Sequence, residues 1–571
     1  MKSFLKYLFV LLSGFFILFF VLFMIILAIS DTDPIINDNS YLHININGSI
    51  PEYIAPNPLV EIYGRVPLDM KKIRDNLEKA AIDERINGVV LDIGFIQTGY
   101  AKIHELQNLI DTYKKSGKRI YAYMEMGFTK SYLIASSCDS IFMPASANLF
   151  LTGLGANVTF YKGLFNKIGI QADFVHVGKH KDAPNSYTEE KMPQDQRMVL
   201  NDLLDQLYDN VIITIAERRN LKKNDVINII ENISGFSARD ALEAGLIDSI
   251  LYEDELADLF NYYDDKPEKI NGATYASIPA SSLNIRNESR IGVIHISGTI
   301  SSGNDVDDPI LGKLAGSNTI VNNINSAAES KSIKAIILRI DSPGGSAIAA
   351  DQIWKAVIDA KQKKPVVASI SDYGASGGYY IAMAADTIIN DPVSIVGSIG
   401  VFAGKFSMEQ LYKKIGLNEE QLLRGKNAAL FSTNNLWSKS ERAIIQRLIE
   451  DFYKDFVSKV AASRNMTFEE TNEVAQGRVW TGNQAIKNNL IDLSGTFYDA
   501  ISVAKEMAEI KITESVRLSY FPKEKDFFSE LYNIISLNSG RINFLKEKET
   551  QLVTGFQNKP LVLMPFILEW N

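Results

Sequence analysis

Apolar and polar positions along the chain divide it into one long apolar segment and two α/β halves. Residues 7–29 are apolar except at Ser13 and Gly14, which is about the 20 residues that a helix needs to cross a bilayer. Farther on, residues 41–48 alternate between apolar and polar, as a half-buried strand does. Residues 290–298 open a second half with the same alternation.

Within each half, short apolar runs typical of buried strands alternate with helical patterns. Residues 88–92 precede a helix predicted around 102–115, and residues 335–340 precede one around 349–361. This alternation predicts an α/β fold with largely parallel strands.

The stretch between the halves, residues 261–287, has charged and Ser/Ala/Pro-rich composition with little apolar periodicity, which is typical of a linker. Each half is long enough to bury its own core. We therefore predict four regions: a tip and membrane anchor at 1–34, an N-terminal repeat at 35–265, a linker at 266–288 and a C-terminal repeat at 289–571.

The two halves also correspond residue by residue. An offset of 247 residues (386 minus 139) places Thr129 of the first half where Ser376 stands in the second. The same offset (425 minus 178) places Lys181 where the second half has Ala428. The second half thus keeps a candidate nucleophile, Ser376, and the first half keeps a candidate base, Lys181. This complementary loss predicts one site that both halves share.

The candidate nucleophile, Ser376, lies in a glycine-rich strand-to-helix junction. Such a turn exposes the serine oxygen while backbone N–H groups point nearby. The N–H groups of Gly377 and of either Gly344 or Gly345, in a second glycine-rich strand exit, are candidate donors to an oxyanion. Taken alone, each glycine motif is also typical of a close-packed turn.

The candidate base is a lysine, because none of the five histidines lies in a motif that the halves share; they are His43, His104, His176, His180 and His295. A lysine acts as a base only when neutral, which requires its pKa to fall by roughly 3 units from about 10.4. Lys181 follows an apolar strand and is the candidate, with His180 in reserve. The alternative for Lys181 is an ordinary solvated charge.

Charge and cysteine content exclude some classes of partner and site. The formal net charge of -9, with 59 Lys and Arg against 68 Asp and Glu, leaves no basic surplus for nucleic acid. The single cysteine, Cys138, excludes an intramolecular disulfide and a multi-cysteine metal site.

Lys2 and Lys6 precede the apolar segment, so we expect the amino end in the cytoplasm and the remainder of the chain across the membrane. A cleaved signal peptide is the alternative. Residues 560–568 are also apolar but too short to span, and they are predicted to be a docked strand or a subunit contact.

Four motifs resemble the signal peptide peptidase A family, also called protease IV, in its long, membrane-anchored form with two repeats; they are residues 342–346, 374–380, 397–401 and 482–485. The match covers nearly the whole chain after the anchor. The resemblance implies two tandem domains of the Clp protease/crotonase-like α/β fold and a serine endopeptidase without metal or cofactor. It implies Ser376 as nucleophile and Lys181 as general base.

The resemblance further implies cleaved signal peptides as substrates, a homotetramer, and a single-pass protein of the bacterial inner membrane with its catalytic domains outside the cytoplasm. Two departures stand out. Residues 92–97 lack the S-P-G-G loop of the second half, so one working site per chain is expected. Residues 185–188 replace the aromatic-containing stretch that usually follows the lysine of the family.

Two rival functions remain at this point. A crotonase-like acyl-CoA enzyme uses paired oxyanion N–H groups too, although a site outside the cytoplasm would lack acyl-CoA. A membrane-tethered scaffold with two decayed repeats is the other, although the loss of opposite members of one pair is better explained by a shared site.

Overall fold

The computed structural model describes residues 7, 12–18, 20, 36–56, 68–261, 266–283, 289–308, 312–523, 561–563 and 569–570. Residues 12–18 are helical, and their apolar side chains are exposed. Over the described parts of the chain, no helix has the length and apolar character needed to cross a membrane. Most of the anchor predicted at 7–29 lies outside the described residues.

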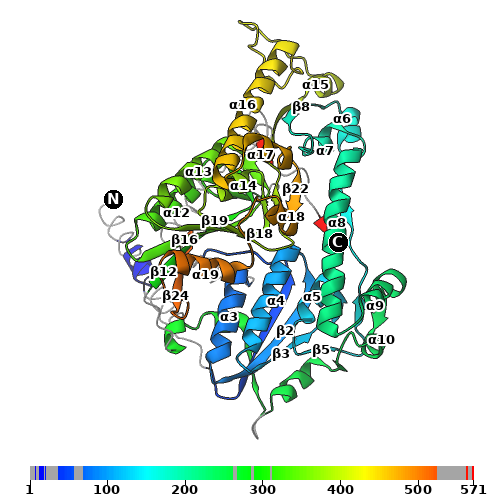
Figure 1. Ribbon diagram of the computed structural model, residues 1–571, viewed down its shortest axis with the longest axis vertical. Helices are drawn as coiled ribbons and strands as arrows, with labels where there is room; N and C mark the ends of the chain where they lie inside the picture. The colour runs from blue at the N-terminus through cyan, green and yellow to red at the C-terminus, as the bar shows by residue number, and fades with distance from the viewer. Residues whose placement is uncertain are drawn as a thin grey trace.

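The first half forms a six-stranded, all-parallel sheet in the order β10-β5-β3-β2-β1-β11 (Figure 1). Its strands are β1 (Ser40–Gly48), β2 (Ile86–Ile96), β3 (Arg119–Tyr123), β5 (Ser140–Met143), β10 (Ser249–Ile250) and β11 (Glu268–Asn271). The last of these lies in the segment predicted as a linker, and it pairs with β1.

The second half repeats this strand order as β23-β19-β18-β16-β12-β24, and it adds β20 and β22 beside β18. Its strands are β12 (Ser289–Ser297), β16 (Ile333–Ser342), β18 (Val366–Ala375), β19 (Thr387–Asn390), β20 (Ile395–Gly397), β22 (Val479–Thr481), β23 (Leu493–Ser494) and β24 (Val516–Phe521). Only β22 runs antiparallel in this sheet. The α/β class with two repeats is therefore confirmed.

Helices cover the faces of both sheets, and each sheet has its own apolar core. The helices of the first repeat are α3 (Met70–Ile82), α4 (Tyr100–Lys114), α5 (Thr129–Ala135), α6 (Lys162–Ile168), α7 (Asn185–Thr188), α8 (Gln194–Arg219), α9 (Lys223–Asn228), η1 (Ile229–Ile233), α10 (Ala238–Glu243), η2 (Glu253–Phe260), α11 (Gly272–Ala276) and η3 (Ala280–Leu283). Those of the second are α12 (Ser317–Glu329), α13 (Ala347–Lys361), α14 (Gly377–Ala382), α15 (Glu409–Ile415), α16 (Lys439–Arg464), α17 (Phe468–Val474), α18 (Gly482–Lys487) and α19 (Phe497–Met507).

A third sheet joins the repeats, in the order β14-β15-β13-β17-β25-β21-β8. Its strands are β8 (Gln171–Val177), β13 (Thr299–Ser301), β14 (Val306–Asp308), β15 (Gly312–Gly316), β17 (Gly344–Ser346), β21 (Val401–Ser407) and β25 (Leu561–Leu563). In it β8 of the first repeat pairs antiparallel with β21 of the second over seven residues, from Val401↔Val177 to Ser407↔Gln171. Part of the apolar segment 560–568 therefore docks as strand β25.

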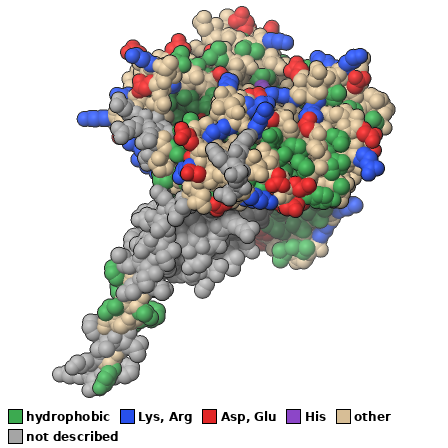
Figure 2. All heavy atoms as spheres, turned by 90° about the horizontal axis from the view of Figure 1, so that it is seen from below, with side chains coloured by type: hydrophobic (Ala, Val, Ile, Leu, Met, Phe, Trp, Pro, Cys, Tyr) green, Lys and Arg blue, Asp and Glu red, His purple; other side chains and the backbone are tan. Residues whose placement is uncertain are grey.

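Two small sheets complete the described structure. One is β4-β6-β9, with β4 (Met126–Phe128), β6 (Asn148–Phe150) and β9 (Gly235–Ser237). The other is β26-β7, with β7 (Ala156–Asn157) and β26 (Glu569–Trp570). On the face shown in Figure 2, basic and acidic side chains are interspersed, so that face has no basic stripe of the kind that follows a nucleic-acid backbone.

Buried ion pairs also connect the repeats. The Arg339 guanidinium of β16 donates to the Glu52 carboxylate at 2.8 Å and to Glu105. Lys102 Nζ on α4 lies 2.6 Å from Asp341 at the end of β16. Breaking one partner of such a pair leaves an uncompensated buried charge, which is strongly destabilising. Residues of the first repeat therefore restrain the end of β16, which leads into the glycine-rich turn at Gly344 and Gly345.

Candidate active site

The candidate nucleophile, Ser376, stands between β18 and α14 with a positive φ of 54° and a ψ of −110°. A non-glycine residue in this region is strained and must be held by its surroundings. The Ser376 N–H donates to the Gly397 carbonyl at 2.7 Å, and the Ser376 carbonyl accepts from the Tyr380 N–H at 2.8 Å. These bonds fix the turn, and the side chain is buried in the described structure.

The candidate base, Lys181, reaches this turn because β8 pairs with β21. After β8 the chain turns at Gly178 (φ 110°), and the His180 N–H donates to the Gln476 carbonyl at 2.7 Å. A Cβ on Gly477 would lie 2.6 Å from the backbone nitrogen of Lys181. Glycine at 477 is therefore needed for this close approach.

The Lys181 side-chain nitrogen lies 2.7 Å from the Ser376 hydroxyl oxygen. It also lies 2.9 Å from Ser398 Oγ and 3.0 Å from the Ser398 carbonyl oxygen. A neutral lysine has one lone pair and two hydrogens, so it can accept from Ser376 and donate to both Ser398 oxygens. The structure thus brings the two predicted residues together within one chain.

The pKa of Lys181 lies well below its ordinary value, because the side chain is completely buried and burial disfavours the ammonium form. The neighbouring Asp182 opposes this effect through its charge. Burial also raises the pKa of Asp182 to about 6. The site therefore favours the neutral lysine that a base requires.

The candidate oxyanion donors lie on two adjoining turns. Gly377 begins α14, so its N–H is among those that have no acceptor within the helix. The Gly344 N–H donates to Ser342 Oγ at 3.2 Å, and a Cβ on Gly345 would overlap the Ile300 carbonyl oxygen. A Cβ on Gly378 would lie 2.7 Å from the Ser342 carbonyl, so the two turns touch.

Strand β25 lies along the second of these turns. It pairs antiparallel with β17, in the register Gly344↔Leu563 and Gly345↔Val562. It also pairs with β21 through Phe402↔Leu561. The chain's own closing segment therefore covers the backbone edge that carries two of the candidate oxyanion glycines.

The positions that correspond to Ser376 and Lys181 in the opposite repeats, Thr129 and Ala428, carry neither a serine nor a lysine. Thr129 begins α5, is buried, and has no hydrogen-bond partner for Oγ1 within the described structure. Ala428, the counterpart of Lys181, is exposed. His180 is buried, and burial lowers its pKa, but in the described structure no hydrogen bond joins its side chain to Ser376 or Lys181. Within the described ranges, no group of three or more His, Cys, Asp or Glu side chains is arranged to hold a metal ion.

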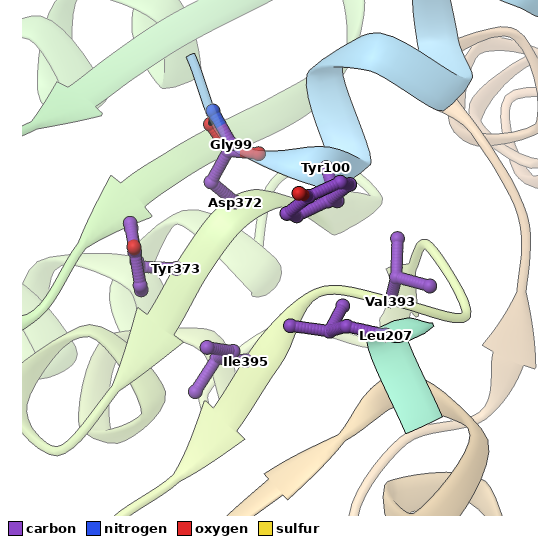
Figure 3. A pocket seen from close by; sticks show the side chains of 7 residues that line it. All are labelled: Gly99, Tyr100, Leu207, Asp372, Tyr373, Val393 and Ile395. Atoms are coloured by element: carbon purple, nitrogen blue, oxygen red, sulfur yellow. Dashed lines mark hydrogen bonds between the residues drawn. The ribbon is translucent and has the colours of Figure 1, made fainter. Parts of the chain in front are cut away.

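A very small cavity of about 10 Å³ lies between the repeats, beside the strand that leads to Ser376 (Figure 3). Its lining comprises Gly99, Tyr100, Leu207, Asp372, Tyr373, Val393 and Ile395. Asp372 is fixed there because its carboxylate accepts from the Gly99 N–H at 3.0 Å and the Lys102 N–H at 3.1 Å, at the start of α4. The rest of the lining is mainly apolar or aromatic.

Sequence reasoning gave no role to Ser398, although residues 397–401 were among the motifs that carry the resemblance. Ser398 is buried and has a positive φ of 51°, which turns both of its oxygens toward Lys181. The only available signal was the Gly-Ser-Ile-Gly run itself.

If the site is the serine peptidase that the resemblance implies, Ser398→Ala should lower kcat/KM for peptide cleavage about tenfold, because Lys181 loses one of its two fixed acceptors, Ser398 Oγ. An acceptor favours the charged form of an amine, so its removal lowers the pKa of Lys181 further. The acid limb of the pH–rate profile should therefore move to lower pH. An unchanged acid limb together with an unchanged rate would show that the Ser398 hydroxyl does not position the lysine.

Comparison with known proteins agrees with the repeated architecture. The model of peptidase family S49 matches residues 112–261 and 358–511, one segment in each repeat. "Serine protease SPPA, chloroplastic" of Arabidopsis thaliana is 36% identical over 460 residues, which cover 79% of this chain and 67% of that protein. "Protease 4" of Haemophilus influenzae is 28% identical over 446 residues, covering 76% of this chain and 72% of the relative. "Protease 4" of Salmonella typhi is 28% identical over 452 residues, covering 76% and 71%.

Proposed function

The chain belongs to peptidase family S49 and is a serine protease, and from this premise we propose that it is a membrane-anchored endopeptidase that works with a Ser376–Lys181 dyad. The observation that carries the proposal is the 2.7 Å separation between Lys181 Nζ and Ser376 Oγ in a buried site. Burial lowers the lysine pKa, and the turn holds the serine oxygen against the lysine nitrogen.

In the proposed reaction, Ser376 Oγ attacks the carbonyl carbon of the scissile bond while its proton passes to Lys181 Nζ. The N–H groups of Gly377 and of the Gly344–Gly345 turn stabilise the tetrahedral oxyanion. The C–N bond then breaks, and the lysine proton goes to the leaving amine. Water next gives a proton to Lys181 as its oxygen attacks the ester, and that proton returns to Ser376 Oγ as the acid product leaves.

The proposed substrates are signal peptides left in the membrane after secretion, cut in their apolar segments. Support comes from a further relative, "Putative signal peptide peptidase SppA" of Enterococcus faecium, which is 33% identical over 195 residues, covering 34% of this chain and 56% of that protein. The proposed location is the bacterial inner membrane, with the catalytic repeats outside the cytoplasm. The proposed assembly is a homotetramer.

A fluorophosphonate probe tests the proposal on the full chain in detergent micelles. The serine oxygen should displace fluoride from phosphorus, and peptide mass spectrometry should locate the adduct on Ser376. A folded protein that does not react with the probe would instead favour the scaffold, and binding of acyl-CoA would favour the crotonase-like alternative.

A chain ending at Asn558 lacks β25. We expect its rates of probe labelling and of peptide cleavage to be at least about threefold higher than those of the full chain. A peptide that pairs with Gly344–Ser346 must displace β25 from that edge. An intramolecular occupant lowers apparent affinity by the fraction of open molecules, and its removal restores that fraction. Unchanged or slower labelling of the folded truncated chain would mean that β25 does not compete with substrate.

A further inference from the structure

The loop between α17 and β22 of the second repeat lies against the turn that carries Lys181 (Figure 1). The Gln476 carbonyl accepts from the His180 N–H at 2.7 Å, and Gln476 Oε1 accepts from the Lys179 N–H at 3.2 Å. A Cβ on Gly178 would lie 2.7 Å from the Gln476 carbonyl carbon, so the two backbones touch. In the described structure, the N–H groups of this turn that bond to another segment both donate to Gln476.

The same loop also holds the residue that bonds the lysine amine. The Arg478 carbonyl accepts from the Ser398 N–H at 2.7 Å, and Ser398 in turn accepts from Lys181 Nζ through both of its oxygens. We name residues 476–478 the lysine clasp. They restrain the main chain of Lys181 directly, and they restrain its side-chain nitrogen through Ser398.

Gln476 is itself held by a network behind the clasp. It has a positive φ of 54°, a conformation that glutamine seldom adopts and that its surroundings must therefore support. Its backbone N–H and its Nε2 donate to the Tyr453 hydroxyl of α16 at 3.4 and 3.1 Å. Nε2 also donates to Asn472 Oδ1 at 2.8 Å. The glutamine side chain therefore connects a buried tyrosine to the turn of the base.

The first repeat has no such contact at the equivalent position. The pairing of β6 with β9 and of β20 with β22 aligns Phe236 with Trp480, an offset of 244 residues (480 minus 236). Asn232 then corresponds to Gln476, and it is exposed in the helical turn η1. Its Nδ2 keeps the bond to the asparagine four positions earlier, Asn228, at 2.9 Å. In the described structure, no hydrogen bond joins the Asn232 side chain to another segment.

The next position differs between the repeats in the same way. A Cβ on Gly477 would lie 2.6 Å from the Lys181 nitrogen, whereas the counterpart Ile233 carries a side chain that is 48% exposed. The clasp is therefore built only in the repeat against which the lysine turn docks.

We propose that Gln476 is a positioning residue for the base, which fixes the turn of Lys181 so that Nζ stays within reach of Ser376 Oγ. The proposal rests on the proposed Ser376–Lys181 dyad, and it adds a residue that touches neither reacting atom. A small displacement of a reacting group lowers the rate strongly, so the effect of Gln476 is on the chemical step.

Gln476→Met tests the side chain, because methionine has a similar volume and lacks both amide atoms. We expect kcat for peptide cleavage and the rate constant of fluorophosphonate labelling to fall about tenfold, with KM within about twofold of wild type. A turn displaced toward solvent also buries Lys181 less, while its charged neighbour Asp182 is unchanged. The lysine pKa then rises, and the acid limb of the pH–rate profile should move to higher pH.

Asn232→Leu is the matched control, since it removes the equivalent bond to the asparagine four positions earlier without any contact to the lysine turn. It should leave cleavage, labelling and the acid limb unchanged. Gln476→Glu is the conservative variant, because it keeps an oxygen for the Lys179 N–H. Above the acid limb, it should label at about half the wild-type rate or faster.

Tyr453→Phe provides a second variant that leaves Gln476 in place. It removes the hydroxyl that accepts from Gln476, and we expect labelling to slow about threefold. In the Gln476→Met protein the same change should have no further effect, because both substitutions break one connection. Thermal unfolding and circular dichroism establish that each variant is folded.

Equal labelling rates and equal acid limbs in Gln476→Met and Asn232→Leu would overturn the proposal, as would a Gln476→Glu variant as slow as Gln476→Met. Lys181→Met, measured in parallel, separates this result from the function. Wild-type labelling that does not need Lys181 would overturn the dyad and this proposal with it. Labelling that needs Lys181 but not Gln476 would overturn this proposal alone.

Discussion

Replacing Ser376 with alanine is expected to lower kcat/KM for peptide cleavage by a factor on the order of 10⁴ or more and to abolish fluorophosphonate labelling. The change removes Ser376 Oγ, the hydroxyl oxygen that lies 2.7 Å from Lys181 Nζ. Alanine tolerates the same backbone as serine, and the N–H and carbonyl bonds of residue 376 are retained. Cleavage of a fluorogenic peptide and the circular dichroism spectrum provide the measurements.

Ser297→Ala is a suitable control, because Ser297 Oγ has no hydrogen-bond partner in the described structure and the same atom is removed. It should leave cleavage and labelling unchanged. Strong residual cleavage by folded Ser376→Ala would exclude Ser376 as the nucleophile and direct attention to another side chain or to activated water.

Lys181→Met is expected to abolish cleavage to a similar extent while raising the free energy of unfolding by about 1 to 2 kcal/mol at neutral pH. Methionine fills a similar volume and loses only the amine. The lysine has a folded pKa below its unfolded pKa, so the unfolded chain binds the extra proton. The contribution of this group to stability therefore rises with pH between the two pKa values, and it is least favourable below the lowered one.

The stability gain of Lys181→Met should accordingly shrink as pH approaches the ordinary lysine pKa of about 10.4, which thermal unfolding at several pH values measures. The wild-type rate should fall on the acid side as Lys181 becomes protonated. Lys405→Met is the control, since Lys405 is equally buried and its Nζ donates to the Ser432 carbonyl at 3.0 Å instead. If Lys181→Met cleaves peptides as fast as Lys405→Met, Lys181 is not the general base.

The fold could be predicted to a large extent because it depends on patterns that are local. Alternating runs at 41–48 and 290–298 appear as β1 and β12, and the offset of 247 residues is matched by the same strand order in both large sheets. The juxtaposition of Lys181 and Ser376 followed from losses at equivalent positions, and the structure brings the two side chains together. Their catalytic roles remain a proposal.

Other features depend on contacts that no single motif encodes. Ser398 contacts the lysine only because of its positive φ. The edge covered by β25 depends on a pairing between residues more than 200 positions apart, such as Gly345 and Val562. The choice between Gly344 and Gly345 depends on local geometry, in which the Gly344 N–H already donates to Ser342.

The separation of the dyad along the chain also governs when the protein becomes reactive. Lys181 and Ser376 are 195 positions apart, so a growing chain holds the amine long before the hydroxyl exists. Contacts of such sequence separation form late, because a long loop must close first. With the proposed dyad, the polypeptide therefore has no competent centre during synthesis, and it becomes able to cut a peptide only when both repeats have folded against each other.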